Sequence, residues 1–281
     1  MTVTATGMSG SHAPGTRAPG ARTPVVLLHA LSLHASMWAA QESALRALGR
    51  TVLAVDQRGF GSAPLGDAPP SLDVVAEDLA RTLDGHGLDR VVLVGSSMGG
   101  YAAMAFLRRH PDRVAGLALL SARATADDPE DAAQRLRFAD LVQDPAHRPA
   151  LVERVTPLLL ADSTCAERPE LLARVLADAR AADPAALAWA QRAIAARPDS
   201  TDVLRAARIP ALVIAGAQDA LVAPEESRYV ADALPQGRLI TLTRTGHLQP
   251  LEAPEAVTDA LRGLLAEVDA TADARSGAGA C

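Results

Sequence analysis

Two adjacent serines lie in a segment whose pattern can support nucleophilic chemistry. The segment "VGSSMGG" spans residues 94–100 and continues a short apolar run. Its pentapeptide "GSSMG" fits Gly-x-Ser-x-Gly with Ser97, not Ser96, at the centre. Between a strand and a helix this pattern forms a sharp turn that exposes the serine hydroxyl, and the glycines leave room for it. The pattern predicts Ser97 as a nucleophile; a capping serine in an ordinary strand-to-helix turn is the alternative.

A serine hydroxyl is a weak nucleophile until a base takes its proton, so a histidine and an orienting acid are expected nearby. Among the seven histidines, His247 follows the last strand-like run on a Gly-containing loop and precedes the last helix. Asp219 comes just after the preceding strand-like run, 28 residues before His247. Taken alone, Asp219 is more typical of a turn or a helix cap. The chain order Ser97, Asp219, His247 on alternating strands and helices predicts a catalytic triad.

The elements that must position these three residues alternate between strands and helices. Dense apolar runs predict strands covered on both faces, as in a parallel sheet. The alternation predicts an α/β fold with a mainly parallel, doubly wound sheet, whose strands present their carboxyl ends at one edge, where sites form. The predicted strands are 24–30, 51–56, 90–95, 114–122, 209–216 and 237–243, and the helices around them are 37–48, 71–87, 97–109, 224–234 and 254–268.

Residues 123–205 break the alternation because they contain no strand-like run. Candidate helices with prolines near their starts fill this segment, which predicts an all-helical cap, or lid, inserted into the sheet domain. The expected sheet domain comprises residues 23–122 and 206–268. Residues 1–22 and 269–281 are rich in small and polar side chains and are predicted to be disordered tails. The candidate cap helices are 129–143, 148–161, 168–182 and 184–196.

The composition excludes several classes of function. The net charge is −6 and only 2% of the residues are aromatic, which argues against nucleic-acid and anionic-membrane partners. All 27 basic residues are arginine, so a Walker phosphate loop and a pyridoxal Schiff base, which both need lysine, are excluded. Two cysteines, Cys165 and Cys281, provide neither a disulfide framework nor a zinc motif.

These features predict a cytoplasmic protein that acts on a small-molecule substrate. No apolar run approaches the roughly 20 residues of a membrane span, and residues 1–22 lack the apolar core of a secretory signal. We expect no metal, no organic cofactor, and no nucleic-acid or membrane partner. A monomer and a homodimer are both compatible with the sequence.

Three segments resemble the α/β-hydrolase fold family, and the resemblance covers roughly residues 24–266. The segment "LLHALSLHASMW" (27–38) is similar to the family's His-Gly oxyanion loop, which ends in tryptophan. The segment "DQRGFGSA" (56–63) is similar to its Asp-x-Arg-Gly-x-Gly turn. The elbow and the helix after it, "SSMGGYAAMAFLRRHPDRVAGLALL", resemble those of small carboxylesterases and enol-lactone hydrolases. The resemblance implies the family's fold and a serine-hydrolase activity.

By matching position, the resemblance implies that the backbone N–H groups of Leu31 and Met98 form the oxyanion hole. Two features depart from the family pattern. Ala30 stands where the family has a glycine after His29, which would strain the loop if that position needed a positive φ. The two antiparallel strands that usually precede the first parallel strand have no clear counterpart, so we expect a sheet of about six strands.

We therefore predict a serine hydrolase that cleaves an ester, a lactone or a related acyl bond of a small, largely aliphatic substrate. A C–C bond hydrolase, a biosynthetic cyclase or lyase, and a non-catalytic ligand receptor are alternatives that use the same triad or pocket. Several side chains could contact the substrate, although each is equally suited to packing. These pocket candidates are Ser32, His34, Trp38, Tyr101, Leu159 and Trp189.

Overall fold

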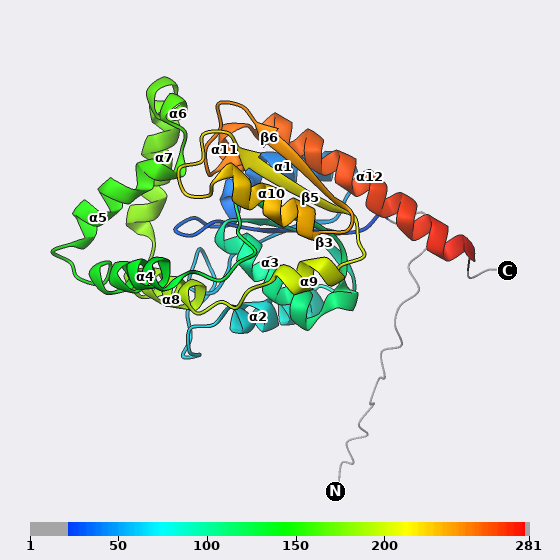
Figure 1. The fold of residues 1–281 in the computed structure, drawn as a ribbon, viewed down its shortest axis with the longest axis horizontal. Helices are drawn as coiled ribbons and strands as arrows, with labels where there is room; N and C mark the ends of the chain where they lie inside the picture. Colours follow the sequence, from blue (N-terminus) through cyan, green and yellow to red (C-terminus); the bar gives the residue numbers. More distant parts are fainter. Residues whose placement is uncertain (1–21, 279–281) are drawn as a thin grey trace, which may run out of the picture.

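The computed structural model describes residues 22–278. These residues form one sheet of six parallel strands with helices packed around it (Figure 1). The strand order is β2-β1-β3-β4-β5-β6, which confirms the predicted parallel α/β sheet and its expected size. The predicted tail at residues 1–22 lies outside the described residues, apart from Arg22. The strands are β1 (Val25–Leu28), β2 (Val52–Val55), β3 (Val91–Ser96), β4 (Val114–Leu120), β5 (Ala211–Gly216) and β6 (Gly237–Leu242).

Helices cover both faces of the sheet, which explains the dense apolar runs in the sequence. In β1, Val26 and Leu28 belong to one apolar cluster, and Val25 and Leu27 belong to a second. Alternate residues of a strand point to opposite faces, so the two clusters are the two sides of the sheet. The first side is covered by α2 (Leu72–Gly85), α3 (Met98–Arg109), α9 (Thr201–Ala206) and α10 (Pro224–Ala233), and the second by α1 (Ala39–Ala47), α11 (Gln249–Glu252) and α12 (Pro254–Ala278).

The segment between β4 and α9 contains helices and no strand, as its sequence predicts. It lies beyond one edge of the sheet in Figure 1, where α4, α5, α6, α7 and α8 are drawn in green. Proline occupies the first turn of α4, α5, α7 and α8, where its missing N–H costs nothing. The elements are α4 (Pro129–Leu141), α5 (Arg148–Val155), the 3₁₀ turn Thr156–Leu159, α6 (Asp162–Glu167), α7 (Pro169–Ala181) and α8 (Pro184–Ala195).

The last helix is longer than the sequence predicts. We expected it to end at residue 268, but α12 continues to Ala278, so the segment expected to form a tail is helical over most of its length. Asp269 fixes this extension: its carboxylate accepts a hydrogen bond from the Thr23 N–H at 3.2 Å and pairs with Arg50 at 2.6 Å. Among residues 22–278, no helix, α12 included, has the length and apolar character needed to cross a membrane.

Candidate active site

Ser97 lies on a sharp turn between β3 and α3. Its backbone has φ 52° and ψ −113°, an unusual conformation for a residue with a side chain. The turn depends on two glycines, because a Cβ on Gly95 would lie 2.3 Å from the carbonyl oxygen of Gly99, and one on Gly99 would lie 2.2 Å from that of Leu28. Such strain costs about 1–3 kcal/mol and clusters at functional sites. The turn thus accepts only glycine at both positions, as the Gly-x-Ser-x-Gly pattern predicts.

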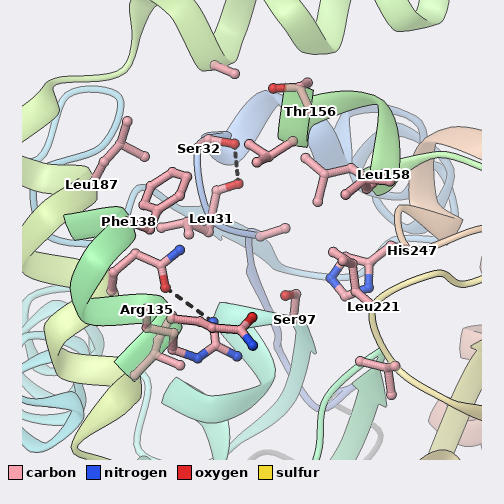
Figure 2. A pocket seen from close by; sticks show the side chains of 18 of the residues that line it. Leu31, Ser32, Ser97, Arg135, Phe138, Thr156, Leu158, Leu187, Leu221 and His247 are labelled. Carbon is pink, nitrogen blue, oxygen red and sulfur yellow. Dashed lines mark hydrogen bonds between the residues drawn. The ribbon is translucent and has the colours of Figure 1, made fainter. Parts of the chain in front are cut away.

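The two adjacent serines have different surroundings. Ser96 is the last residue of β3, is fully buried, and its hydroxyl has no hydrogen-bond partner within residues 22–278. Ser97 instead lines a cavity, and Figure 2 shows its side chain projecting into it. Of the two hydroxyl groups, only that of Ser97 is therefore accessible to a substrate.

His247 and Asp219 form a buried pair beside the elbow. Nδ1 of His247 lies 3.0 Å from each carboxylate oxygen of Asp219, and both side chains are almost fully buried. The loop that carries His247 packs closely on the end of β5, since a Cβ on Gly216 would lie 2.0 Å from the Gly246 carbonyl oxygen. His247 and Ser97 line the same cavity (Figure 2). The structure therefore brings together three residues that the sequence separates by up to 150 positions.

The loop after β1 is fixed by a buried histidine. His29 donates from Nδ1 to the carbonyl of Ala30 at 2.8 Å, and its Nε2 accepts the backbone N–H of Gln57 at 2.9 Å. The Gln57 side chain donates in turn to the His29 carbonyl at 2.7 Å. Burial lowers the pKa of His29 to about 4, although the bond to Ala30 opposes this effect. His29 is thus a neutral structural link between the first two strand ends.

Leu31 and Met98, to which the resemblance assigns an oxyanion hole, follow β1 and β3 in the chain. Leu31 follows the His29 loop and lines the cavity, and Met98 is the first residue of α3. Within residues 22–278, neither of these backbone N–H groups donates a hydrogen bond to another protein group. Ala30 does not have a positive φ; Ser32 does, at 64°. The expected strain from alanine at position 30 is therefore absent.

The cavity has a volume of about 410 Å³ and lies between the sheet edge and the helical segment. This size is within the range of small-molecule sites, roughly 300–1,000 Å³. Just over half of its lining residues are aliphatic. Of the six pocket candidates, Ser32, Tyr101 and Leu159 line the cavity. Apolar residues that the sequence analysis did not single out include Phe138, Val155, Leu158, Leu187, Ile194 and Leu221.

Three pocket candidates do not line the cavity. Trp38 is fully buried in the apolar layer between the sheet and α12. Trp189 turns its indole N–H to the carbonyl of Ala68, 2.8 Å away. His34 is 40% exposed and lies 3.7 Å from the carboxylate of Asp178. Packing and surface contacts, rather than substrate contacts, account for these side chains.

The comparison with known families agrees with this geometry. A profile of the family described as "alpha/beta hydrolase fold" matches residues 23–254. The chain belongs to this family. The match includes the turn at Ser97, the residues Asp219 and His247, and the helical segment between β4 and α9.

Individual relatives of this α/β-hydrolase are named as enzymes. A thermophilic esterase from Thermogutta terrifontis, solved with malate bound, has a TM-score of 0.84 and 38% identity, over 89% of this chain and 92% of its own. The enol-lactonase from Burkholderia xenovorans LB400 has a TM-score of 0.79 and 28% identity, over 88% and 93%. A Variovorax paradoxus protein named "Putative carbamate hydrolase RutD" is 32% identical, over 84% of this chain and 89% of its own. The chain is accordingly a hydrolase.

Within this α/β-hydrolase, Asp219 has partners that the sequence analysis missed. One carboxylate oxygen accepts the hydroxyl of Ser121 at 2.6 Å, and the other accepts the backbone N–H groups of Leu221 and Val222 at 2.8 and 3.1 Å. Burial alone would raise the pKa of Asp219, but the hydrogen bonds from His247, Ser121 and Leu221 outweigh burial and lower it. Asp219 therefore remains ionised well into the acidic range.

Ser121 is itself held by Gln249. The buried Gln249 amide donates to the Ser121 hydroxyl at 2.5 Å and to the Gly246 carbonyl at 2.8 Å. Because the hydroxyl accepts this bond, its own proton is directed to Asp219. Ser121 also has a positive φ, 49°, at the end of β4. A polar residue directly after an apolar strand was the available signal for Ser121.

Glu252 joins the His247 loop to the helical segment. Its carboxylate accepts the backbone N–H of Gly246 at 3.0 Å and that of Leu248 at 3.2 Å, on either side of His247. It also accepts the N–H of Ala161 at 2.9 Å and the hydroxyl of Thr164 at 2.8 Å, both between β4 and α9. A single carboxylate thus joins the His247 loop to the helical segment between β4 and α9.

Proposed function

We propose that this α/β-hydrolase cleaves an ester, a lactone or a related acyl bond through nucleophilic attack by Ser97. One observation carries the proposal: Ser97, on its strained turn, and His247, paired with Asp219, line a single cavity. The relatives named as an esterase, an enol-lactonase and a carbamate hydrolase support hydrolysis of an acyl bond. The aliphatic lining supports a small, largely apolar substrate.

In this mechanism His247 acts as the base. It takes the proton of Ser97 while Oγ attacks the carbonyl carbon of the substrate. The contact between Nδ1 and Asp219 fixes the tautomer, so Nε2 accepts the proton, and the carboxylate stabilises the imidazolium that forms. The imidazolium then protonates the leaving group. Water, activated by His247 in the same way, releases the acyl group from Ser97.

The oxyanion is stabilised by two backbone donors. The N–H groups of Leu31 and Met98 bind the oxygen that becomes negative as Ser97 attacks. Loss of one such donor typically lowers the rate about 10²–10³-fold. The helical segment at residues 123–205 acts as a lid in this proposal, because it covers the cavity and excludes water that would weaken these interactions.

A panel of p-nitrophenyl esters and simple lactones tests the proposal with two matched variants. Ser97→Ala removes the nucleophile, and we expect kcat to fall by roughly 10⁶. Ser96→Ala removes the neighbouring buried hydroxyl, and we expect activity within about threefold of the wild type, because that hydroxyl makes no hydrogen bond within residues 22–278 and Ser96 does not line the cavity. Equal loss in both variants, or activity retained in Ser97→Ala, would contradict the assignment.

A further inference from the structure

One end of the cavity is charged, unlike its aliphatic remainder. Arg123, Asp131 and Arg135 line this end, together with the side-chain amides of Gln134 and Gln191. Arg123 follows β4 and the other two charged residues belong to α4, so the charged end lies where the lid joins the sheet. In the view of Figure 2, Arg135 and His247 lie on opposite sides of Ser97. The proposed mechanism gives these charged groups no role.

A buried carboxylate holds the arginines in place. Asp127, whose side chain is fully buried, pairs with Arg123 at 2.9 Å, Arg135 at 2.6 Å and Arg197 at 2.8 Å. Burial alone would raise the pKa of Asp127, but Arg197 and Arg135 outweigh burial and lower it, so the group is charged. Asp131 pairs with Arg123 at 2.7 Å. Three guanidinium groups therefore face two carboxylates, which leaves one positive charge.

Two guanidinium donors at the cavity have no acceptor within residues 22–278. Nε of Arg123 is buried without a hydrogen-bond partner, although the Tyr101 side chain interacts with the same guanidinium. Arg135 uses Nε and Nη1 to bind Asp127 and Gln191, and no bond is made by its Nη2. The Arg123 and Arg135 side chains are only 19% and 22% exposed, so water screens their surplus positive charge in part. A negatively charged oxygen at this end of the cavity would balance that charge and accept hydrogen bonds from both donors.

We propose that the substrate carries a carboxylate that binds at Arg123 and Arg135 while its acyl carbonyl meets Ser97. This inference rests on the proposed acyl hydrolysis and names its substrate class: an acyl compound with a second, charged end. A carboxylate suits the planar guanidinium donors. Its single charge also neutralises the network, whereas a phosphate monoester, with almost two charges at neutral pH, would leave an uncompensated negative charge.

Esters that differ only in their terminal charge provide the first test. The mono-p-nitrophenyl esters of succinic, glutaric and adipic acid carry the carboxylate, and their methyl p-nitrophenyl diesters are neutral counterparts. After subtraction of spontaneous hydrolysis, we expect the charged ester to have a kcat/KM about tenfold higher or more at one chain length at least. Equal values at all three lengths would overturn the inference while leaving serine hydrolysis intact.

Two substitutions on the same helix provide the second test. Arg135→Gln removes a charge from the cavity, and we expect the ratio of charged to neutral kcat/KM to fall about tenfold, through KM. Arg137→Gln makes the same chemical change at an exposed position outside the cavity and is expected to leave the ratio unchanged. A similar change in both variants, or in neither, contradicts the carboxylate site.

Equilibrium binding separates the inference from the proposed function. In the Ser97→Ala protein, calorimetry with monomethyl adipate and dimethyl adipate needs no turnover and no arginine variant. We expect the charged compound to bind about tenfold more tightly or more. Equal affinities, or weaker binding of the charged compound, overturn the carboxylate site. Selective binding together with no turnover of any ester by the wild type contradicts acyl hydrolysis and supports the carboxylate site.

Discussion

The sheet edge and the lid hold their functional residues by different means. Every residue of the strands β3 and β5 is buried, and the turns at their carboxyl ends carry Ser97 and Asp219. In the lid, α4 has 13 residues, of which only Ala139 is buried. Two arginines of the lid line the cavity, Arg123 before α4 and Arg135 within it. Both are positioned by ion pairs to Asp127. Buried strands and a polar network together position Ser97, Asp219 and His247, whereas ion pairs at a largely exposed helix position the arginines of the lid.

This difference predicts separate effects on kcat and on the preference among substrates. Densely packed elements open rarely, whereas segments with few buried apolar contacts are the ones that move or adapt most easily. Substitutions at the sheet edge should therefore lower kcat for every substrate. Substitutions in the lid should change the preference among substrates, as the Arg135→Gln ratio tests.

Asp219→Asn should have the largest effect. The amide nearly preserves shape but removes the charge that orients His247 and stabilises its cation, so we expect kcat to fall by roughly 10⁴ for all esters. Steady-state kinetics measures the loss, and Asp232→Asn, at an exposed position of α10, is the control. A loss below about tenfold would remove Asp219 from the mechanism.

His29 should limit stability in acid. Its folded pKa of about 4 lies below its ordinary value of 6.5, so it stabilises the fold fully above pH 6.5 and progressively less as the pH falls towards 4. The difference corresponds to about 3 kcal/mol. Urea unfolding at several pH values should show a smaller loss in His29→Gln than in the wild type. Equal losses in both proteins would mean that another group controls acid unfolding.

Glu252→Gln should affect both regions at once. The amide replaces a charged acceptor of the Gly246, Leu248 and Ala161 N–H groups, so the His247 loop and the lid lose their common support. A displacement of about 1 Å near the reacting groups can cost on the order of 10² in rate, and we expect a loss of that size in kcat. Glu255→Gln, exposed on α12, should have no effect.

Ser121→Ala should have the smallest effect, and its diagnostic is the pH profile. Loss of the hydroxyl donor raises the pKa of Asp219, because that bond favours the ionised carboxylate. We expect kcat to fall about tenfold and the acidic limb of the profile to move to higher pH. An unchanged limb would show that Ser121 supports the fold without acting on Asp219.

Local patterns in the sequence were sufficient to predict the sheet and the elbow. Six strand-like runs predicted the six strands, and the four central ones, β1, β3, β4 and β5, are almost entirely apolar because they are fully buried. The glycines around Ser97 were informative because only glycine allows the contacts seen at Gly95 and Gly99. Short-range rules therefore reach the fold class and the strained turn that carries Ser97.

Long-range contacts were not predictable in the same way. The bond between Gln249 and Ser121 joins residues 128 positions apart, and that between Glu252 and Ala161 spans 91. The sequence around a tryptophan also does not show whether its side chain lines a cavity. Trp189 was expected at the cavity but bonds to the Ala68 carbonyl instead. Similarly, no local pattern distinguishes Arg123 and Arg135 from 25 other arginines. Only the three-dimensional arrangement identifies them.

The central claim is that the hydroxyl of Ser97 is the nucleophile. Treatment with a fluorophosphonate, followed by mass spectrometry of the peptide around residues 90–108, tests it directly because the reagent bonds only to an activated serine. The account predicts one adduct, on Ser97, in the wild type and in Ser96→Ala, and none in Ser97→Ala or His247→Gln. An adduct on Ser96, or labelling that survives in Ser97→Ala, would contradict the account.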